Sequence, residues 1–95
     1  YQPACRVEVA EPGTAAARAT HLAMGGEQVG LLAASAAPAG VVGLGRFHGA
    51  GELAAMLYDA LRRAEDADLD VVVVETVTER GVGRAVMDRL RRAAG

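Results

Sequence analysis

The sequence Leu69-Asp70-Val71-Val72-Val73-Val74-Glu75 decides the fold class of this 95-residue chain. Four β-branched residues in succession, without alternating polar ones, are typical of a strand that is covered on both faces in a parallel sheet. The preceding residues 52–67 carry apolar side chains at helical spacing, which predicts an amphipathic helix. The apolar stripe of that helix consists of Leu53, Met56, Leu57, Ala60, Leu61 and Ala64. A helix that leads directly into a buried strand indicates an α/β fold.

The rest of the chain continues this alternation of strands and helices. We expect further strands over residues 4–10 and 28–33, and a weaker, glycine-diluted strand over residues 41–44. Further helices are expected over residues 15–24 and 83–93. Strands that alternate with helices predict a mostly parallel sheet with right-handed crossovers, flanked by helices in a two-layer or three-layer sandwich.

Composition and charge narrow the classes of function. Hydrophobic residues make up 52% of the chain and charged residues 23%, which is typical of a globular domain. A net charge of −2 argues against attraction of the whole domain to nucleic acid or to an anionic membrane. Cys5 is the only cysteine, so no disulfide can form within the chain, and a reducing, cytoplasmic setting fits best. No apolar run reaches the roughly 20 residues that span a bilayer, so we expect no membrane contact.

A cluster of glycines follows the weak third strand, in the sequence Gly43-Leu44-Gly45-Arg46-Phe47-His48-Gly49. Glycines between a strand and a helix can let backbone N–H groups approach a pyrophosphate at the helix N-terminus. Gly43, Gly45 and Gly49 are therefore candidate nucleotide-binding residues. With them, the segment up to Gly51 could make the chain a stand-alone nucleotide- or dinucleotide-binding module. The spacing differs by one residue from the dinucleotide fingerprint, however, and a plain flexible loop is the alternative.

The other polar residues do not form a pattern that predicts a catalytic or metal site. His21 and His48 have no Cys, Asp or Glu near them at the spacing of metal ligands, and Ser35 lacks the context of a nucleophile elbow. We therefore expect no activity from this chain alone, and no metal or cofactor bound to it. Arginines on the last predicted helix could face tRNA, but no aromatic residues are interleaved with them for base stacking, so this partner is less favoured.

The second half of the chain resembles the C-terminal domain of two-domain threonylcarbamoyl-AMP synthases. The resemblance rests on residues 57–64 and 69–75, and above all on the motif Gly81-Val82-Gly83-Arg84-Ala85-Val86-Met87-Asp88-Arg89-Leu90. Tyr1 and Pro3 are similar to the end of the family's interdomain linker. The resemblance thus implies that residues 1–3 end a linker and that residues 4–95 form a single Rossmann-like accessory domain.

The resemblance also implies a function for a parent protein. In the family, an N-terminal catalytic domain uses L-threonine, bicarbonate and ATP to make threonylcarbamoyl-AMP for the modification of tRNA. This chain would then be a non-catalytic domain that docks on or gates the N-terminal domain, its expected partner.

Six residues are candidates for docking or for communication between the domains. Five of them come from the motifs that carry the resemblance, and these are Tyr1, Gly81, Gly83, Asp88 and Arg89. Glu75 is added because a carboxylate that ends a buried parallel strand lies at the sheet edge where α/β ligands and partners meet. The two glycines have alternatives: they allow close packing of the last helix, or they open its N-terminus to an anion.

Overall fold

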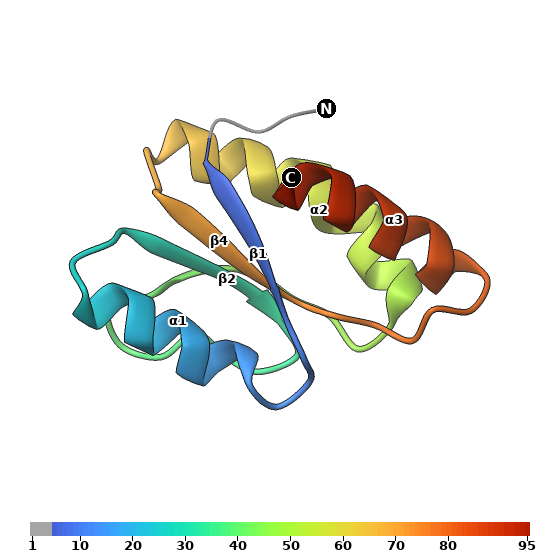
Figure 1. Cartoon of the computed structure of the whole chain (residues 1–95), viewed down its shortest axis with the longest axis horizontal. Coiled ribbons are helices and arrows are strands. Elements are labelled where there is room, and N and C mark those ends of the chain that lie inside the picture. Colours follow the sequence, from blue (N-terminus) through green and yellow to red (C-terminus); the bar gives the residue numbers. More distant parts are fainter. Residues whose placement is uncertain (1–4) are drawn as a thin grey trace.

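The structure is a computed structural model that describes residues 5–95. Tyr1 and the predicted linker, residues 1–3, lie outside the described residues. The elements, in chain order, are β1 (Arg6–Ala10), α1 (Ala15–Met24), β2 (Val29–Ala33), β3 (Val42–Arg46), α2 (Ala50–Asp66), β4 (Val71–Glu75) and α3 (Val82–Ala94) (Figure 1). The predicted α/β alternation is confirmed. Among these helices, none is long and apolar enough to cross a membrane.

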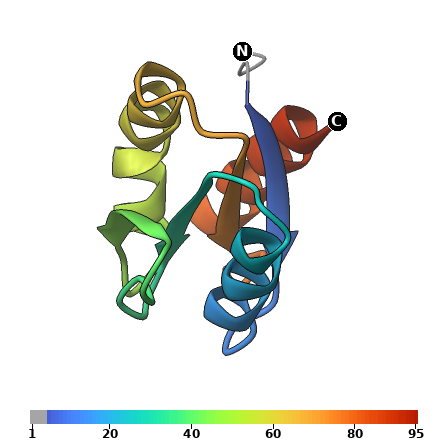
Figure 2. The same cartoon turned by 90° about the vertical axis from the view of Figure 1, so that its left-hand side faces the viewer.

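The four strands form one parallel sheet in the order β1-β4-β2-β3, which Figure 2 shows with β1 and β3 at its edges. The connection from β1 to β2 passes over β4, and the connection from β3 to β4 passes back over β2. Right-handed crossovers that run in opposite directions place their helices on opposite faces of a sheet. Accordingly, α1 covers one face, and α2 and α3 cover the other (Figure 1). The sandwich therefore has three layers.

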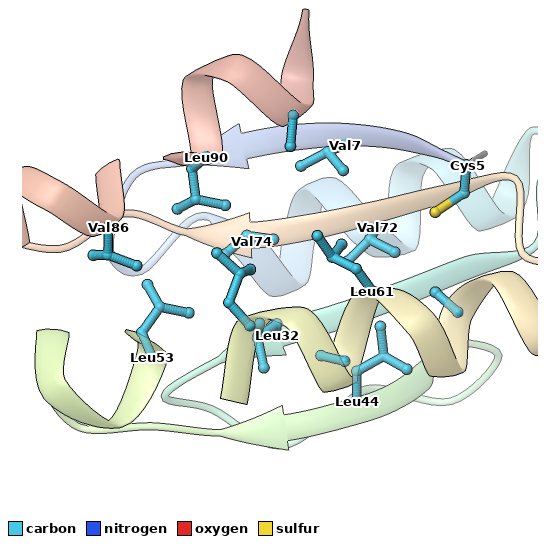
Figure 3. Close-up of a cluster of buried hydrophobic side chains, with 14 of the residues drawn as sticks. Cys5, Val7, Leu32, Leu44, Leu53, Leu61, Val72, Val74, Val86 and Leu90 are labelled. Atoms are coloured by element: carbon cyan, nitrogen blue, oxygen red, sulfur yellow. The ribbon is translucent and has the colours of Figure 1, made fainter. Parts of the chain in front are cut away.

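The central strand β4 contributes to both cores. Val71 and Val73 pack with the small residues of α1, whereas Val72 and Val74 pack with α2 and α3 (Figure 3). All four valines are 0% exposed, which explains why the sequence shows an unbroken apolar run here instead of alternation.

The predicted boundaries on both sides of the glycine cluster differ from the structure by two residues each. The third strand extends beyond residue 44 to Arg46, through an irregularity at which Gly45 has a φ of +149°. The second helix begins at Ala50, because Gly49 is its N-cap and accepts the N–H of Leu53 at 3.1 Å. Both shifts shorten the segment that separates β3 from α2.

Candidate functional site

The carboxyl edge of the sheet, where all four parallel strands end, contains Glu75 at the end of the central strand. Its Oε1 accepts the backbone N–H of Ala34, which follows β2, at 3.3 Å. On the other side of β4, the N–H of Thr76 donates to the carbonyl oxygen of Ala10 at 2.9 Å. The chain leaves β1 and β2 toward the α1 face and leaves β4 toward α3, so Glu75 lies at the topological switch point of the sheet. The half-buried carboxylate ties the ends of two neighbouring strands together.

Two glycines shape the turn into α3. Gly81 is the N-cap and has a φ of +53°, a conformation that L side chains rarely adopt. Gly83 is buried in the first turn of the helix, where a Cβ atom would lie 1.8 Å from the carbonyl oxygen of Thr78. Gly83 thus permits close packing between the helix and the segment that precedes it, whereas a Cβ atom on Gly81 would meet nothing within 4 Å.

The exposed side of α3 carries an open hollow of about 570 Å³. We call it the α3 hollow, and its lining residues are Glu79, Gly81, Arg84, Ala85, Asp88 and Arg91. The Glu79 carboxylate accepts two hydrogen bonds from the Arg91 guanidinium, at 2.8 and 2.5 Å. That bonding lowers the pKa of Glu79, and it fastens the segment after β4 to the helix. Asp88 in turn forms an ion pair with Arg92 at 2.8 Å.

Arg89 points away from the α3 hollow, into a groove between α2 and α3. We call this the α2–α3 groove, and it is lined by Leu57, Tyr58, Leu61, Arg89, Arg92 and Ala93. The structure therefore brings the predicted docking residues Gly81 and Asp88 into one hollow and separates Arg89 from both. Consecutive residues on a helix are about 100° apart around its axis, since 3.6 residues make one turn.

The three candidate nucleotide-binding glycines are not in one loop. Gly43 and Gly45 lie within the edge strand β3, and only Gly49 lies at the start of α2. A Cβ atom on Gly45 would approach Met56 Sδ to 3.2 Å, so this glycine makes room for α2. At the helix start, the His48 N–H donates to Glu52 Oε1 at 2.6 Å. An acidic side chain therefore occupies the space where a phosphate would approach.

Sequence reasoning missed the positions of two residues of α2, one beside the α2–α3 groove and one at the edge of the sheet. Tyr58 is 46% exposed beside the buried stripe of α2, although it is one of only two tyrosines in the chain. Arg63 donates through Nη2 to the carbonyl oxygen of Leu44, at the outer edge of the sheet, and through Nε to Asp59 at 3.0 Å. Tyr58 follows the apolar stripe of α2 by one position, and this placement of an aromatic residue could have indicated its exposure. The sequence gives no comparable signal for the contact between Arg63 and Leu44, because these residues are 19 positions apart.

The titratable side chains of residues 5–95 form exposed ion pairs, for example Arg6 with Glu27 and Arg18 with Glu8, and no buried charged site. Within that range, no group of three His, Cys, Asp or Glu residues is placed to hold a metal ion, and no charged side chain is fully buried. His21 is exposed on α1, and His48 is exposed before α2. Cys5 is buried as a free thiol, and burial raises its pKa.

Comparison with known proteins shows that the whole chain matches one protein family. Residues 1–95 match the family described as threonylcarbamoyl-AMP synthase, C-terminal domain. The chain is 48% identical over 44 residues to the threonylcarbamoyl-AMP synthase of Pyrococcus abyssi, an alignment that covers 46% of this chain and 13% of that protein. It is 46% identical over 43 residues to the enzyme of the same description from Bacillus subtilis, covering 45% of this chain and 12% of that protein.

The similarity to solved structures extends over more of the chain than the sequence alignments do. The crystal structure of P. abyssi Sua5 complexed with L-threonine is similar with a TM-score of 0.85 and 31% identity, covering 100% of this chain and 29% of that chain. The C-terminal Sua5 domain of a hypothetical Sua5 protein from Pyrococcus horikoshii is similar with a TM-score of 0.71 and 34% identity, covering 94% of this chain and 92% of that one. The chain thus spans less than a third of the longer relatives.

Proposed function

The chain belongs to the family of C-terminal domains of threonylcarbamoyl-AMP synthases, and we propose from this that it is a non-catalytic accessory domain that docks on or gates a catalytic domain. The observation that carries the proposal is the pair of structural matches. The chain is similar over its whole length to 29% of a Sua5 protein that was crystallised with L-threonine. It is also similar to a C-terminal Sua5 domain that was crystallised without the rest of its protein. In this proposal, the remainder of the synthase uses L-threonine, bicarbonate and ATP, and its product serves tRNA modification in the cytoplasm.

The arrangement of charges supports an accessory role. Activation of a carboxylate by ATP depends on charged groups that are held in place around the phosphates. In the α3 hollow, both carboxylates are already engaged: Glu79 pairs with Arg91, and Asp88 pairs with Arg92. Carboxylates that are already paired are less available to act on a substrate, which supports a role without chemistry of its own.

The candidate docking residues have two kinds of role in this proposal. Glu75, Gly81 and Gly83 hold the segments around the carboxyl edge in place through a hydrogen bond, a positive φ and a close contact. Asp88 and Arg89 are exposed on α3, where a partner domain can contact them.

A pyrophosphate-release assay tests the location of the chemistry. The purified 95-residue chain and the full-length synthase that contains it are each incubated with ATP, bicarbonate and L-threonine. We expect threonine-dependent pyrophosphate release from the full-length protein and none from the chain alone. Release by the chain alone, in proportion to its concentration, would overturn the proposal.

The same preparation tests the alternative of a stand-alone nucleotide-binding module. Thermal unfolding of the chain is followed with ATP, AMP or NADPH added. A ligand at 100 times its dissociation constant stabilises a protein by about 2.7 kcal/mol. We expect no shift of the Tm, and a saturable rise with any of the three would favour the module instead.

A further inference from the structure

The α2–α3 groove is a small hollow with an apolar floor and a polar rim, on the face of the domain that carries two helices. Leu57, Leu61 and Ala93 form its floor and are nearly buried, at 3%, 1% and 7% exposed, whereas Tyr58 is 46% exposed at its side. The volume of the hollow is about 120 Å³. Small-molecule sites usually measure at least roughly 300 Å³, but a cavity of roughly 150 Å³ holds a benzene-sized group. The groove therefore fits one apolar side chain and is too small for a nucleotide.

The rim of the groove is basic, although the chain as a whole has a net charge of −2. Arg92 is paired with Asp88, but none of the carboxylates in residues 5–95 forms an ion pair with Arg89. Arg62 is exposed one turn after Tyr58 on the same side of α2, and it too lacks a paired carboxylate in the described part of the chain. An unpaired guanidinium beside an apolar floor is complementary to a carboxylate that stands next to an apolar side chain.

The position of the groove indicates where such a partner would come from. β1 begins at the same end of the domain at which α2 and α3 end (Figures 1 and 2). The groove includes Arg92 and Ala93 from the last turn of α3, so it opens toward that end. In a full-length synthase, the preceding part of the protein enters the domain there. A tether at this end gives nearby segments a high effective concentration at the groove.

We infer that the α2–α3 groove binds a segment of the synthase's own N-terminal part that carries a carboxylate next to an apolar side chain. The carboxylate pairs with Arg89, and the apolar side chain fills the hollow between Leu57, Leu61 and Ala93. This inference rests on the proposed docking function, and it specifies the surface and the chemistry of the contact.

An NMR titration tests the inference, because a chain of 9.7 kDa gives well-resolved amide spectra. The 15N-labelled chain is titrated with the unlabelled N-terminal part of the same synthase, and the dissociation constant is taken from the shifts. We expect the largest shifts at residues 57–61 and 89–93. Arg89→Glu should raise the dissociation constant at least about tenfold, since it places like charges together. Ala93→Leu, which fills the hollow without changing charge, should also weaken binding, and its Tm verifies that it folds.

Arg84→Glu is the matched control, because Arg84 is on the same helix, forms no ion pair with a carboxylate of residues 5–95, and lines the α3 hollow instead. It should change the dissociation constant by less than about twofold, as expected for a charge outside the contact. Shifts centred on the α3 hollow, or a loss of binding in Arg84→Glu but not in Arg89→Glu, would overturn the inference while leaving docking intact. No shifts at millimolar concentration, together with unchanged activity of a synthase lacking the domain, would overturn docking itself. If tRNA produces the shifts at the groove and the N-terminal part does not, the occupant is RNA and the inference is wrong.

Discussion

Gly83 offers the sharpest test of the packing between α3 and the segment that follows β4. In Gly83→Ala, the new Cβ atom would lie 1.8 Å from the carbonyl oxygen of Thr78, and real Cβ contacts are essentially never under 3.0 Å. The obstacle is a backbone oxygen, and this oxygen also accepts the N–H of Arg80 at 3.0 Å. The whole turn between β4 and α3 must therefore move to admit one methyl group.

The size of the effect follows from two opposing contributions. Overpacking of a well-packed site costs about 1–3 kcal/mol, and we expect the upper end here because no flexible side chain can yield. Replacing glycine by alanine inside a helix gains up to about 1 kcal/mol. The net loss in the free energy of unfolding is then about 2 kcal/mol. In a domain of this size, that loss lowers the Tm by roughly 8–16 °C.

Gly51→Ala is the matched control. Gly51 is the second residue of α2, as Gly83 is the second residue of α3, and a Cβ atom there would meet nothing within 4 Å. It should raise the free energy of unfolding by about 0.5–1 kcal/mol. Both variants are measured by urea unfolding followed by circular dichroism, with thermal scans alongside. If Gly83→Ala is as stable as the wild type, or gains as much as Gly51→Ala, the close contact does not exist and the reasoning fails.

Three further substitutions test other contacts by the same urea unfolding. Glu75→Ala should lower the free energy of unfolding by about 1 kcal/mol, because it removes the acceptor of a partly buried N–H. Glu75→Gln keeps an oxygen there and should lose less, and equal losses in the two variants would contradict this. A hydrogen bond from Arg18, at 2.6 Å, lowers the pKa of Glu8 below its ordinary value of 4.5. The contribution of this pair to the free energy of unfolding is therefore present above pH 4.5 and is lost as the pH falls through the lowered pKa. Glu8→Gln should therefore be less stable than the wild type at pH 6–7, and the difference should vanish at the lowest pH. Arg63→Ala should lose about 1 kcal/mol through its hydrogen bond to a strand carbonyl, whereas Arg62→Ala should be neutral, and equal effects of the two would refute this assignment.

The layers of the fold were only partly predictable from the sequence. The valines of β4 indicated burial on both faces, because a half-exposed strand would alternate apolar with polar residues. Two or three layers could not be distinguished, since the answer depends on where β4 inserts between β1 and β2. That insertion joins residues more than 40 positions apart, for example Val29 to Val71, and no local pattern encodes such a pairing.

The glycine cluster shows why a local motif can suggest a binding site that the structure does not assemble. Gly43 and Gly45 resembled part of a phosphate loop, but the edge strand tolerates glycine and continues through both. A signal against the phosphate loop was available in Glu52. An acidic residue at the third position of a helix folds back onto the N–H groups before it, and here it accepts the N–H of His48. The same groups cannot bind a phosphate while this carboxylate is in place.

The carboxyl edge and the α2–α3 groove have different roles in the proposed function. At the carboxyl edge, where α/β sheets usually bind ligands, Glu75 is engaged by the N–H of Ala34. In the α2–α3 groove, Arg89 lies beside an apolar floor and forms no ion pair with any carboxylate of residues 5–95. A substitution of Glu75 should reduce the stability of the domain more than its binding of the N-terminal part. A substitution of Arg89 should reduce this binding more than the stability. Because the stabilising contacts and the proposed docking contacts fall on different residues, Glu75→Ala and Arg89→Glu separate them. Two variants that lose both properties in equal measure would show that this division is wrong.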